Sequence, residues 1–313
     1  MKVLLAVSGG IDSMYMLHRA PELFPGASFA VAHCNFRLRG EESDGDEAFV
    51  AAQCASLGVE CFVKRFYTLE YASGHGVSVE MAARELRYAW FSELCSEHRF
   101  DALATAHNAN DNAETMVLNL LRGTGTKGLR GIPDRADLLR PLLGVTREEI
   151  RVWMEEKGFA WREDSTNAES EVKRNKIRNR VFPVFAEINP SFVKTLGEDM
   201  ARIRQTDDIA EDYYQEAAAR IEKRAPEASG DAILEISVKS LLELKHWRYV
   251  LWRALEDYGF SAETFGKLCD LLDRYLNEPS GTVTLSGKTF QSPTHYIKAR
   301  KKSLCLFLRS QDK

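Results

Sequence analysis

Residues 3–17 read VLLAVSGGIDSMYML and place a short polar turn between an apolar run and a helical pattern. Val3–Val7 is a continuous apolar run that ends in glycines, which is typical of a strand buried on both faces of a parallel sheet. From Asp12 the spacing of Met14 and Leu17 predicts a helix that packs back on this strand. The turn therefore lies where a strand ends and a helix begins, and there the main-chain N–H groups and the helix dipole favour an anion.

The residue types of this turn suit a phosphate group. Gly9 and Gly10 allow a ligand to approach the main chain, and the hydroxyls of Ser8 and Ser13 add donors. The alternative is an ordinary turn in which Asp12 or Ser13 only caps the helix. The hexapeptide SGGIDS lacks the lysine of the G-x-x-x-x-G-K-[ST] loop and does not fit G-x-G-x-x-G. It therefore predicts a phosphate site of another kind.

Composition and charge restrict the class of protein. With 313 residues, 44% hydrophobic and 28% charged, the chain is long enough for one large and one smaller globular domain. No apolar stretch approaches the ~18 residues of a membrane span and no targeting segment precedes the first strand, so we expect a cytoplasmic protein that binds no membrane. The six cysteines have no C-x-x-C spacing, which predicts reduced thiols and no zinc site. Because the formal net charge is −4, nucleic acid would need a local basic patch.

Apolar runs alternate with helical patterns over the first part of the chain. The expected strands are 3–7, 29–34, 61–66 and 101–106, and the expected helices are 13–20, 43–57, 78–98 and 111–121. This alternation predicts an α/β fold, a doubly wound parallel sheet with ligands at the carboxyl ends of its strands. A further helix is expected after Thr146, which forms a capping box with Glu149.

The alternation stops near Asn189. Beyond this residue, amphipathic patterns predict helices over 192–224, 237–256 and 261–277, followed by short strands in the tail. We therefore predict two domains. Residues 1–188 would form a Rossmann-like domain, and residues 189–313 would form a smaller, mainly helical domain with a short β-rich tail.

Polar side chains follow the expected second strand. His33, Asn35 and Arg39 are candidates for a site at the strand ends. The acidic run 41–47 is more simply explained as a solvated helix start.

Two carboxylates follow the expected fourth strand. Asp111 and Glu114 lie three residues apart, hence on one face of a helix. The same spacing fits a capping box with Asp111 as the cap, so a functional and a structural role are equally compatible with it. His107, taken alone, is more often structural than catalytic.

Basic residues gather in three segments. Arg84 and Arg87 lie on an otherwise apolar helix, where arginine usually snorkels or pairs with a carboxylate. The glycine-rich segment 122–131 is either a mobile loop over phosphates or an exposed connection. The run 173–180 contacts phosphates, forms a solvated face, or has an arginine that pairs with an acid such as Asp164. We favour phosphate contacts, because five cations in eight residues outnumber the nearby acids.

Together these segments resemble one family. The motifs, in order, are SGGIDS (8–13), HCNFRLRG (33–40), AARELRY (82–88), AHNANDNAET (106–115), RGTGTKGL (122–129), RPLL (140–143), DSTN (164–167) and RNKIR (174–178). The first resembles the pyrophosphate (PP) loop of the N-type ATP pyrophosphatases, and the set resembles the tRNA(Ile)-lysidine synthetases over residues 1 to about 188. One departure is Phe36-Arg37, where many members carry His-Gly, so we assign these two positions no catalytic role. Many members also carry a further C-terminal domain.

The resemblance implies a reaction, its cofactors and its partners. ATP would adenylate the wobble cytidine of a CAU-anticodon tRNA(Ile) at its 2-oxo group, free L-lysine would replace that oxygen to give lysidine, and AMP and pyrophosphate would be released. The implied ATP-binding residues are Ser8, Gly9, Gly10, Ile11, Asp12, Ser13 and His33, with Asp12 holding Mg²⁺ through the pyrophosphate. The implied catalytic residues are Asp12, Arg87, Asp111 and Glu114, of which Asp111 and Glu114 also bind lysine. The candidate tRNA contacts are Lys127, Arg130, Arg174, Lys176 and Arg178, and further candidates in the basic C-terminal tail are Lys298, Arg300, Lys301 and Lys302.

Three other functions are compatible with parts of the pattern. A tRNA thiolase with the same loop would deliver sulfur but usually needs paired cysteines, and only Cys34 lies near the expected site. An ammonia-using synthetase would leave RNKIR and the basic tail unexplained. A non-catalytic, nucleotide-gated RNA-binding protein would not need Asp12, Asp111 and Glu114. The oligomeric state is left open, with a homodimer among the candidates.

Overall fold

The computed structural model describes residues 1–133, 135–162, 169–224, 232–278 and 284–309, without the side chains of 169–172. It divides into two compact units, Met1–Gln205 and Thr206–Lys313. The first unit thus extends beyond residue 188, so that the residues up to Gln205 pack with it rather than with the second unit. The boundary near residue 188 stays a prediction about where the catalytic part ends.

The first unit is built on a five-stranded parallel sheet. Its strands are β1 (Lys2–Ala6), β2 (Ser28–Asn35), β3 (Cys61–Arg65), β4 (Ala102–Ala104) and β5 (Leu138–Leu139), in the order β3-β2-β1-β4-β5. β1 lies in the middle, with Leu5 paired to Val31 on one side and to Ala104 on the other. The prediction of a parallel sheet is confirmed, and β5 is an additional strand.

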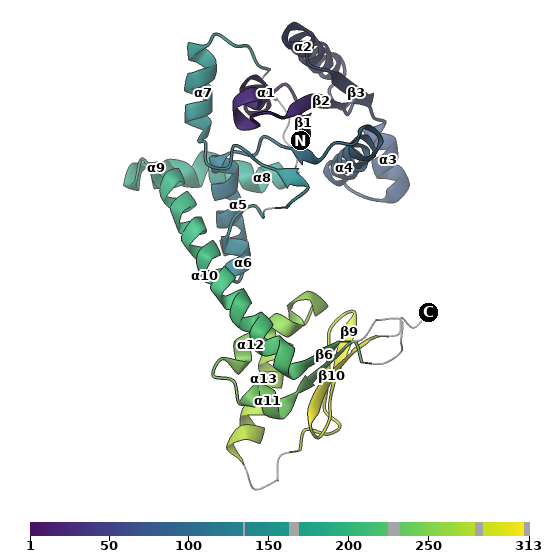
Figure 1. Cartoon of the computed structure of the whole chain (residues 1–313), viewed down its shortest axis with the longest axis vertical. Coiled ribbons are helices and arrows are strands. Elements are labelled where there is room, and N and C mark those ends of the chain that lie inside the picture. Colours follow the sequence, from purple (N-terminus) through teal and green to yellow (C-terminus); the bar gives the residue numbers. More distant parts are fainter. Residues whose placement is uncertain (134, 163–168, 225–231, 279–283, 310–313) are drawn as a thin grey trace. The chain divides into compact units, whose positions relative to one another are not determined.

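Helices cover both faces of this sheet (Figure 1). They are α1 (Ile11–Leu23), α2 (Glu41–Leu57), α3 (Thr68–His75), α4 (Val79–His98) and α7 (Arg147–Glu156). Val3 and Leu5 pack with α1, α2 and α7, whereas Leu4 packs with α4 on the other face. All three side chains are completely buried, because successive residues of a strand point to opposite faces and each face has a helical layer.

Further helices of the first unit pack beside the sheet. They are α5 (Ala109–Arg122), α6 (Thr126–Leu129), α8 (Glu169–Lys176), a π-helical turn (Ile177–Val181), α9 (Phe182–Ile188) and the first part of α10 (Phe192–Ile221). Ala113 and Val117 of α5 form a separate core with Ile177 and Phe182. This core holds the segment after α8 against α5, which carries the two predicted carboxylates.

The second unit combines helices with an antiparallel sheet. Its strands are β6 (Glu222–Arg224), β7 (Leu234–Ser237), β8 (Thr289–Gln291), β9 (His295–Ala299) and β10 (Ser303–Leu308), in the order β6-β7-β10-β9-β8. Its helices are α11 (Val238–Leu242), α12 (Trp247–Leu255), a 3₁₀ turn (Glu256–Tyr258) and α13 (Ala262–Asn277), together with the end of α10. Leu251 and Leu272 of the helices share one core with Ile236 and Leu304 of the sheet. The β-rich tail was predicted, whereas β6 and β7 were not. Among the described residues no helix is both long and apolar enough to cross a membrane.

Candidate active site

The turn after β1 is closed by the hydroxyl of Ser13. The main-chain N–H groups of Ser8 and Gly9 both donate to Ser13 Oγ over 3.2 Å, and this hydroxyl donates to the Gly10 carbonyl over 2.9 Å. Gly9 has a φ of +98°, which a glycine adopts without strain. Gly10 is the N-cap of α1, and no side chain of the described residues caps this helix start. The alternative of an Asp12 or Ser13 cap is therefore wrong, and the hydroxyls expected to meet a phosphate bond to the loop itself.

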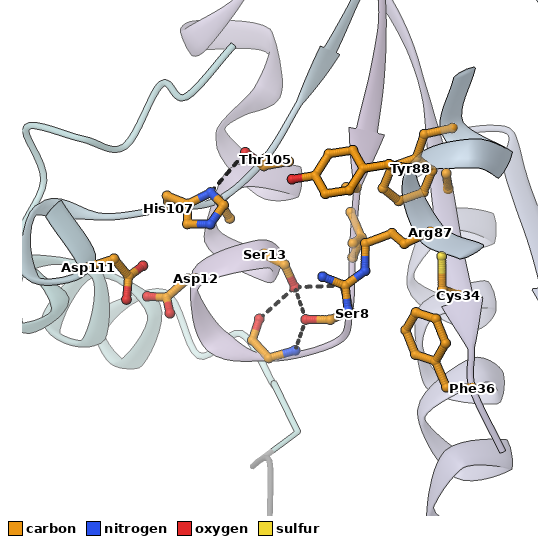
Figure 2. Close-up of a pocket in the computed structure, with 16 residues that line it drawn as sticks. Ser8, Asp12, Ser13, Cys34, Phe36, Arg87, Tyr88, Thr105, His107 and Asp111 are labelled. Atoms are coloured by element: carbon orange, nitrogen blue, oxygen red, sulfur yellow. Dashed lines mark hydrogen bonds between the residues drawn. The ribbon is translucent and has the colours of Figure 1, made fainter. Parts of the chain in front are cut away.

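A cavity of about 360 Å³ opens above this loop, at the carboxyl ends of the central strands. The predicted site residues that line it are Ser8, Gly10, Asp12, Ser13, Arg87 and Asp111. Figure 2 shows Asp12 and Asp111 on one side of the cavity and Arg87, Cys34 and Phe36 on the other. The structure thus brings together residues from the loop, α4 and α5 that are far apart in the sequence.

Asn108 joins the start of α5 to the loop. Its Oδ1 accepts from the main-chain N–H groups of Asn110 and Asp111 over 2.9 and 3.0 Å, and Asp111 Oδ2 accepts from Asn108 N over 3.1 Å. This is a capping box, but Asn108 is the cap and Asp111 its partner, so the expected box with Asp111 as the cap is wrong. The remaining group of Asn108, Nδ2, donates to Asp12 Oδ1 over 3.0 Å. One buried residue, Asn108, therefore orients both carboxylates, Asp12 through its side-chain amide and Asp111 through its main-chain N–H.

Glu114 lies behind Asp111 and is completely buried. Arg178 forms a two-pronged ion pair with it, with Nε 2.7 Å from Oε1 and Nη2 3.1 Å from Oε2. The same Nη2 is 3.5 Å from Asp111 Oδ1. The guanidinium of Arg178 is thus directed at these carboxylates, which differs from the predicted contact with a tRNA phosphate.

Comparison with known proteins agrees with this geometry. The model of the PP-loop domain matches residues 1–185, and that of the TilS substrate binding domain matches residues 229–307. The tRNA(Ile)-lysidine synthase of Chlorobaculum tepidum is 41% identical over 282 residues, which cover 87% of this chain and 83% of that protein. The chain belongs to the tRNA(Ile)-lysidine synthase family. The member from Porphyromonas gingivalis is 38% identical over 297 residues, which cover 94% of this chain and 61% of that protein, so the chain spans about three fifths of this longer relative.

The fold of the first unit also occurs outside the tRNA(Ile)-lysidine synthase family. The U34-tRNA thiolase NcsA of Methanococcus maripaludis aligns with a TM-score of 0.54 at 19% identity, over 65% of this chain and 72% of that one. This likeness concerns the fold alone.

Burial controls the charges around the cavity. It raises the pKa of Asp12, against the opposing effect of Arg147, so a nearby cation would stabilise the charged carboxylate. It also raises the pKa of Glu114, against the opposing effect of Arg178. Burial lowers the pKa of His107, whose Nδ1 lies 3.0 Å from Thr105 Oγ1, so this imidazole is neutral at pH 7. The pKa of Cys34 is raised by burial to about 12, which keeps it a thiol.

Some predicted residues lie outside the cavity. His33 is 2% exposed, and its Nδ1 donates to the Val7 carbonyl over 2.9 Å, so it supports the strand before the loop from behind. This position differs from the predicted contact with ATP. Conversely, Phe36, to which we assigned no catalytic role, lines the cavity, and the Arg87 guanidinium lies 5.1 Å from its ring centroid. The Arg84 guanidinium lies instead over the ring of Tyr88, 5.0 Å from the ring centroid.

The candidate tRNA contacts lie on separate elements. Lys127 is in α6 and Arg130 follows it, whereas Arg174 and Lys176 are in α8. Lys176 is exposed and Arg174 is half-buried. Lys298 and the turn 300–302, further basic candidates, are exposed in the second unit. The DSTN motif, including Asp164, lies outside the described residues.

The acidic run 41–47 is not simply solvated, contrary to expectation. Asp46 is 7% exposed, and Asn35 donates to Asp44 over 2.9 Å and to Glu47 over 2.8 Å. The sequence contained one signal for this, because a buried polar residue at a strand end needs partners. Asn35 and Arg39 of the HCNFRLRG motif therefore donate to carboxylates at the start of α2, which is a structural role.

Proposed function

We propose that this chain is a tRNA(Ile)-lysidine synthetase, which adenylates the wobble cytidine of a CAU-anticodon tRNA(Ile) and transfers free L-lysine to C2. The observation that carries the proposal is the cavity that combines the loop with Asp12, Arg87 and Asp111, in a chain of this family. A cytoplasmic location accompanies this function, and a homodimer stays a prediction. Residues 1–188 would perform catalysis, and residues 189–313 would bind the body of the tRNA.

The first step would use the loop and Asp12. The 2-oxo oxygen attacks the α-phosphorus of ATP and pyrophosphate leaves, so negative charge moves onto the β-phosphate. The start of α1 is not capped by any side chain that the structure describes, and its N–H groups and dipole would stabilise this charge. The carboxylate of Asp12 suits Mg²⁺, which usually takes one or two carboxylates plus phosphate oxygens and would supply further charge neutralisation. Arg87 would neutralise the phosphate of the adenylate.

The second step would use the carboxylates of α5. Free lysine has an ε-amine pKa of about 10.4, so deprotonation at pH 7 costs roughly 4–5 kcal/mol and requires a base. The Asp111 side chain is 22% exposed, whereas that of Glu114 is fully covered. We infer that Asp111 receives the ammonium directly and that Glu114 takes part after Arg178 shifts. Attack of the amine on C2 would then break the C–O bond, and AMP would leave with the former oxo oxygen.

The test is incubation with tRNA(Ile) carrying the CAU anticodon, Mg²⁺, ATP and labelled L-lysine, followed by nucleoside analysis. We expect lysidine, with one AMP and one pyrophosphate for each, and no ATP turnover without tRNA. The Asp12→Asn variant should lose all products, whereas Cys34→Ser should keep them, because the raised pKa of the Cys34 thiol, about 12, leaves little nucleophilic thiolate. Production of ADP and phosphate would contradict the proposal, and loss of activity in a folded Cys34→Ser variant would favour a thiolase.

A further inference from the structure

A buried carboxylate connects two segments that are far apart in the sequence. Asp46 of α2 is 7% exposed and accepts from Arg39 Nη2 over 2.6 Å and from Arg162 Nε over 2.7 Å. Arg39 belongs to the HCNFRLRG motif, and Arg162 stands two residues before the DSTN motif. Neither ion pair involves a residue that lines the cavity.

Arg162 also contacts the loop through its main chain. Its N–H donates to the Gly9 carbonyl over 2.9 Å. A Cβ atom added to Gly9 would lie 3.4 Å from Val50 Cγ2 and 3.8 Å from Arg162 Cγ, and one added to Gly45 would lie 3.1 Å from Arg162 Nη2. The residue therefore lies against Gly9, and neither of the two is among the residues that line the cavity.

The conformation of Gly9 decides where the loop's N–H groups point. Its φ of +98° is accessible to glycine, but glycine has the widest choice of alternatives, so the backbone there is held only by its contacts. The hydrogen bond from Arg162 N is one such contact, and the ion pair with Asp46 fixes the residue that makes it. Preorganised donors bind a charged group more tightly, because less ordering is needed at binding.

We propose that Asp46 and Arg162 are positioning residues, whose ion pair holds the main chain of Arg162 against Gly9 and so sets the affinity of the loop for pyrophosphate groups. This inference rests on the proposed function in one respect, that the loop is the site of the β- and γ-phosphates. It concerns binding and makes no use of the lysine or tRNA steps.

The same helix offers a matched control. Glu47, next to Asp46, forms a two-pronged ion pair with Arg65, with distances of 2.8 and 2.9 Å. That pair joins α2 to the end of β3 and does not contact the loop. Substitution of Arg65 therefore removes an arginine that pairs with α2, as substitution of Arg162 does, but leaves the hydrogen bond to Gly9 in place.

The experiment measures binding of Mg·ATP, Mg·pyrophosphate and AMP by calorimetry in the full chain. We expect Arg162→Ala to weaken ATP and pyrophosphate about tenfold, the order expected for loss of a group that orients binding residues. AMP, which lacks the β- and γ-phosphates, should bind as before. Arg162→Lys should recover most of the affinity, because an ammonium can still pair with Asp46, and Arg65→Ala should change none of the three.

The melting temperature of each variant is measured beside its binding. Asp46→Asn should also weaken ATP and pyrophosphate, because it removes the same ion pair from the other side. Equal weakening of ATP and AMP, or equal effects of Arg162→Ala and Arg65→Ala, would overturn the inference. A wild-type chain that binds ATP and pyrophosphate but makes no lysidine would refute the proposed function and leave this inference standing. A wild-type chain that binds neither ligand would refute both.

Discussion

At the scale of single residues, substitutions of Asp111 and Glu114 distinguish a role in lysine transfer from a structural role. Asp111→Asn and Glu114→Gln keep the shape of each side chain, and an amide oxygen can still accept the hydrogen bond from Asn108 N. We expect lysine transfer to fall about 10²- to 10⁴-fold, because a base is lost, while tRNA-dependent adenylate formation changes little. Single-turnover measurement of pyrophosphate and of lysidine distinguishes the steps. Equal losses in both steps, or a melting shift large enough to explain them, would assign the pair a structural role.

At the scale of one element, the start of α7 has the predicted capping box. Thr146 Oγ1 accepts from Glu149 N over 3.2 Å, and Glu149 Oε2 accepts from Thr146 N over 2.8 Å. The ion pair with Lys194 and the Thr146 donors lower the pKa of Glu149 from 4.5 to about 2. Because the folded-state pKa is the lower one, this stabilisation is present above pH 4.5 and is lost as the pH falls toward 2. Glu149→Gln should therefore cost about 0.5–1 kcal/mol at pH 7 and almost nothing below a pH of about 2. Melting curves of the wild type and of Glu149→Gln over this pH range measure the difference in stability, with Glu148→Gln as the control. A difference that does not depend on pH would contradict the prediction.

At the scale of the whole molecule, the net charge of −4 means that tRNA must bind to local basic patches. Arg178 pairs with Glu114, so Arg174 and Lys176 are the better candidates in α8. Their joint replacement by alanine should flatten the plot of log affinity against log salt concentration by about 1.4–1.8, at roughly 0.7–0.9 per phosphate contact. Arg178→Ala should instead lower the melting temperature, since it leaves Glu114 buried without its counter-ion, and should keep the salt slope. A wild-type slope in the double variant would direct the search to Lys298 and to residues 300–302.

Much of the first unit was predictable because its signals are local. Four of the five parallel strands follow from short apolar runs, and the loop, Asp12 and Asp111 follow from motifs at the ends of their elements. Arg87 lies in the middle of α4 and was implied only by the resemblance of the AARELRY motif. β5 was missed because it has only two residues. β7 was missed because its partner β10 lies far along the chain, with Leu234 paired to Leu306, and pairing over such a separation leaves no local pattern. β6 pairs with β7 and follows α10 directly, so its residues were predicted as the end of the helix over 192–224.

The unpredicted part of the site consists of long-range ion pairs. Arg178 and Glu114 are 64 residues apart, and Arg162 and Asp46 are 116 apart. A sequence shows that such charges exist but not which of them meet. The partner is decided by how α5 packs on the π-helical turn after α8, and α2 on the segment after α7. The basic run 173–180 illustrates this. Its excess of cations favoured phosphate contacts, yet one of its arginines neutralises a buried acid.

Asn108 both caps α5 and donates to Asp12, and this has a consequence for which mutations the gene tolerates at this position. Aspartate caps helices as well as asparagine does, so a library selected for folded protein would accept it at codon 108. A carboxylate there could no longer donate to Asp12 Oδ1, and it would put a third acidic group beside Asp12 and Asp111. A library selected for ATP use would therefore retain asparagine. Deep mutational profiles for expression and for activity should diverge at this codon, although its side chain is only 1% exposed and would pass for an ordinary core position.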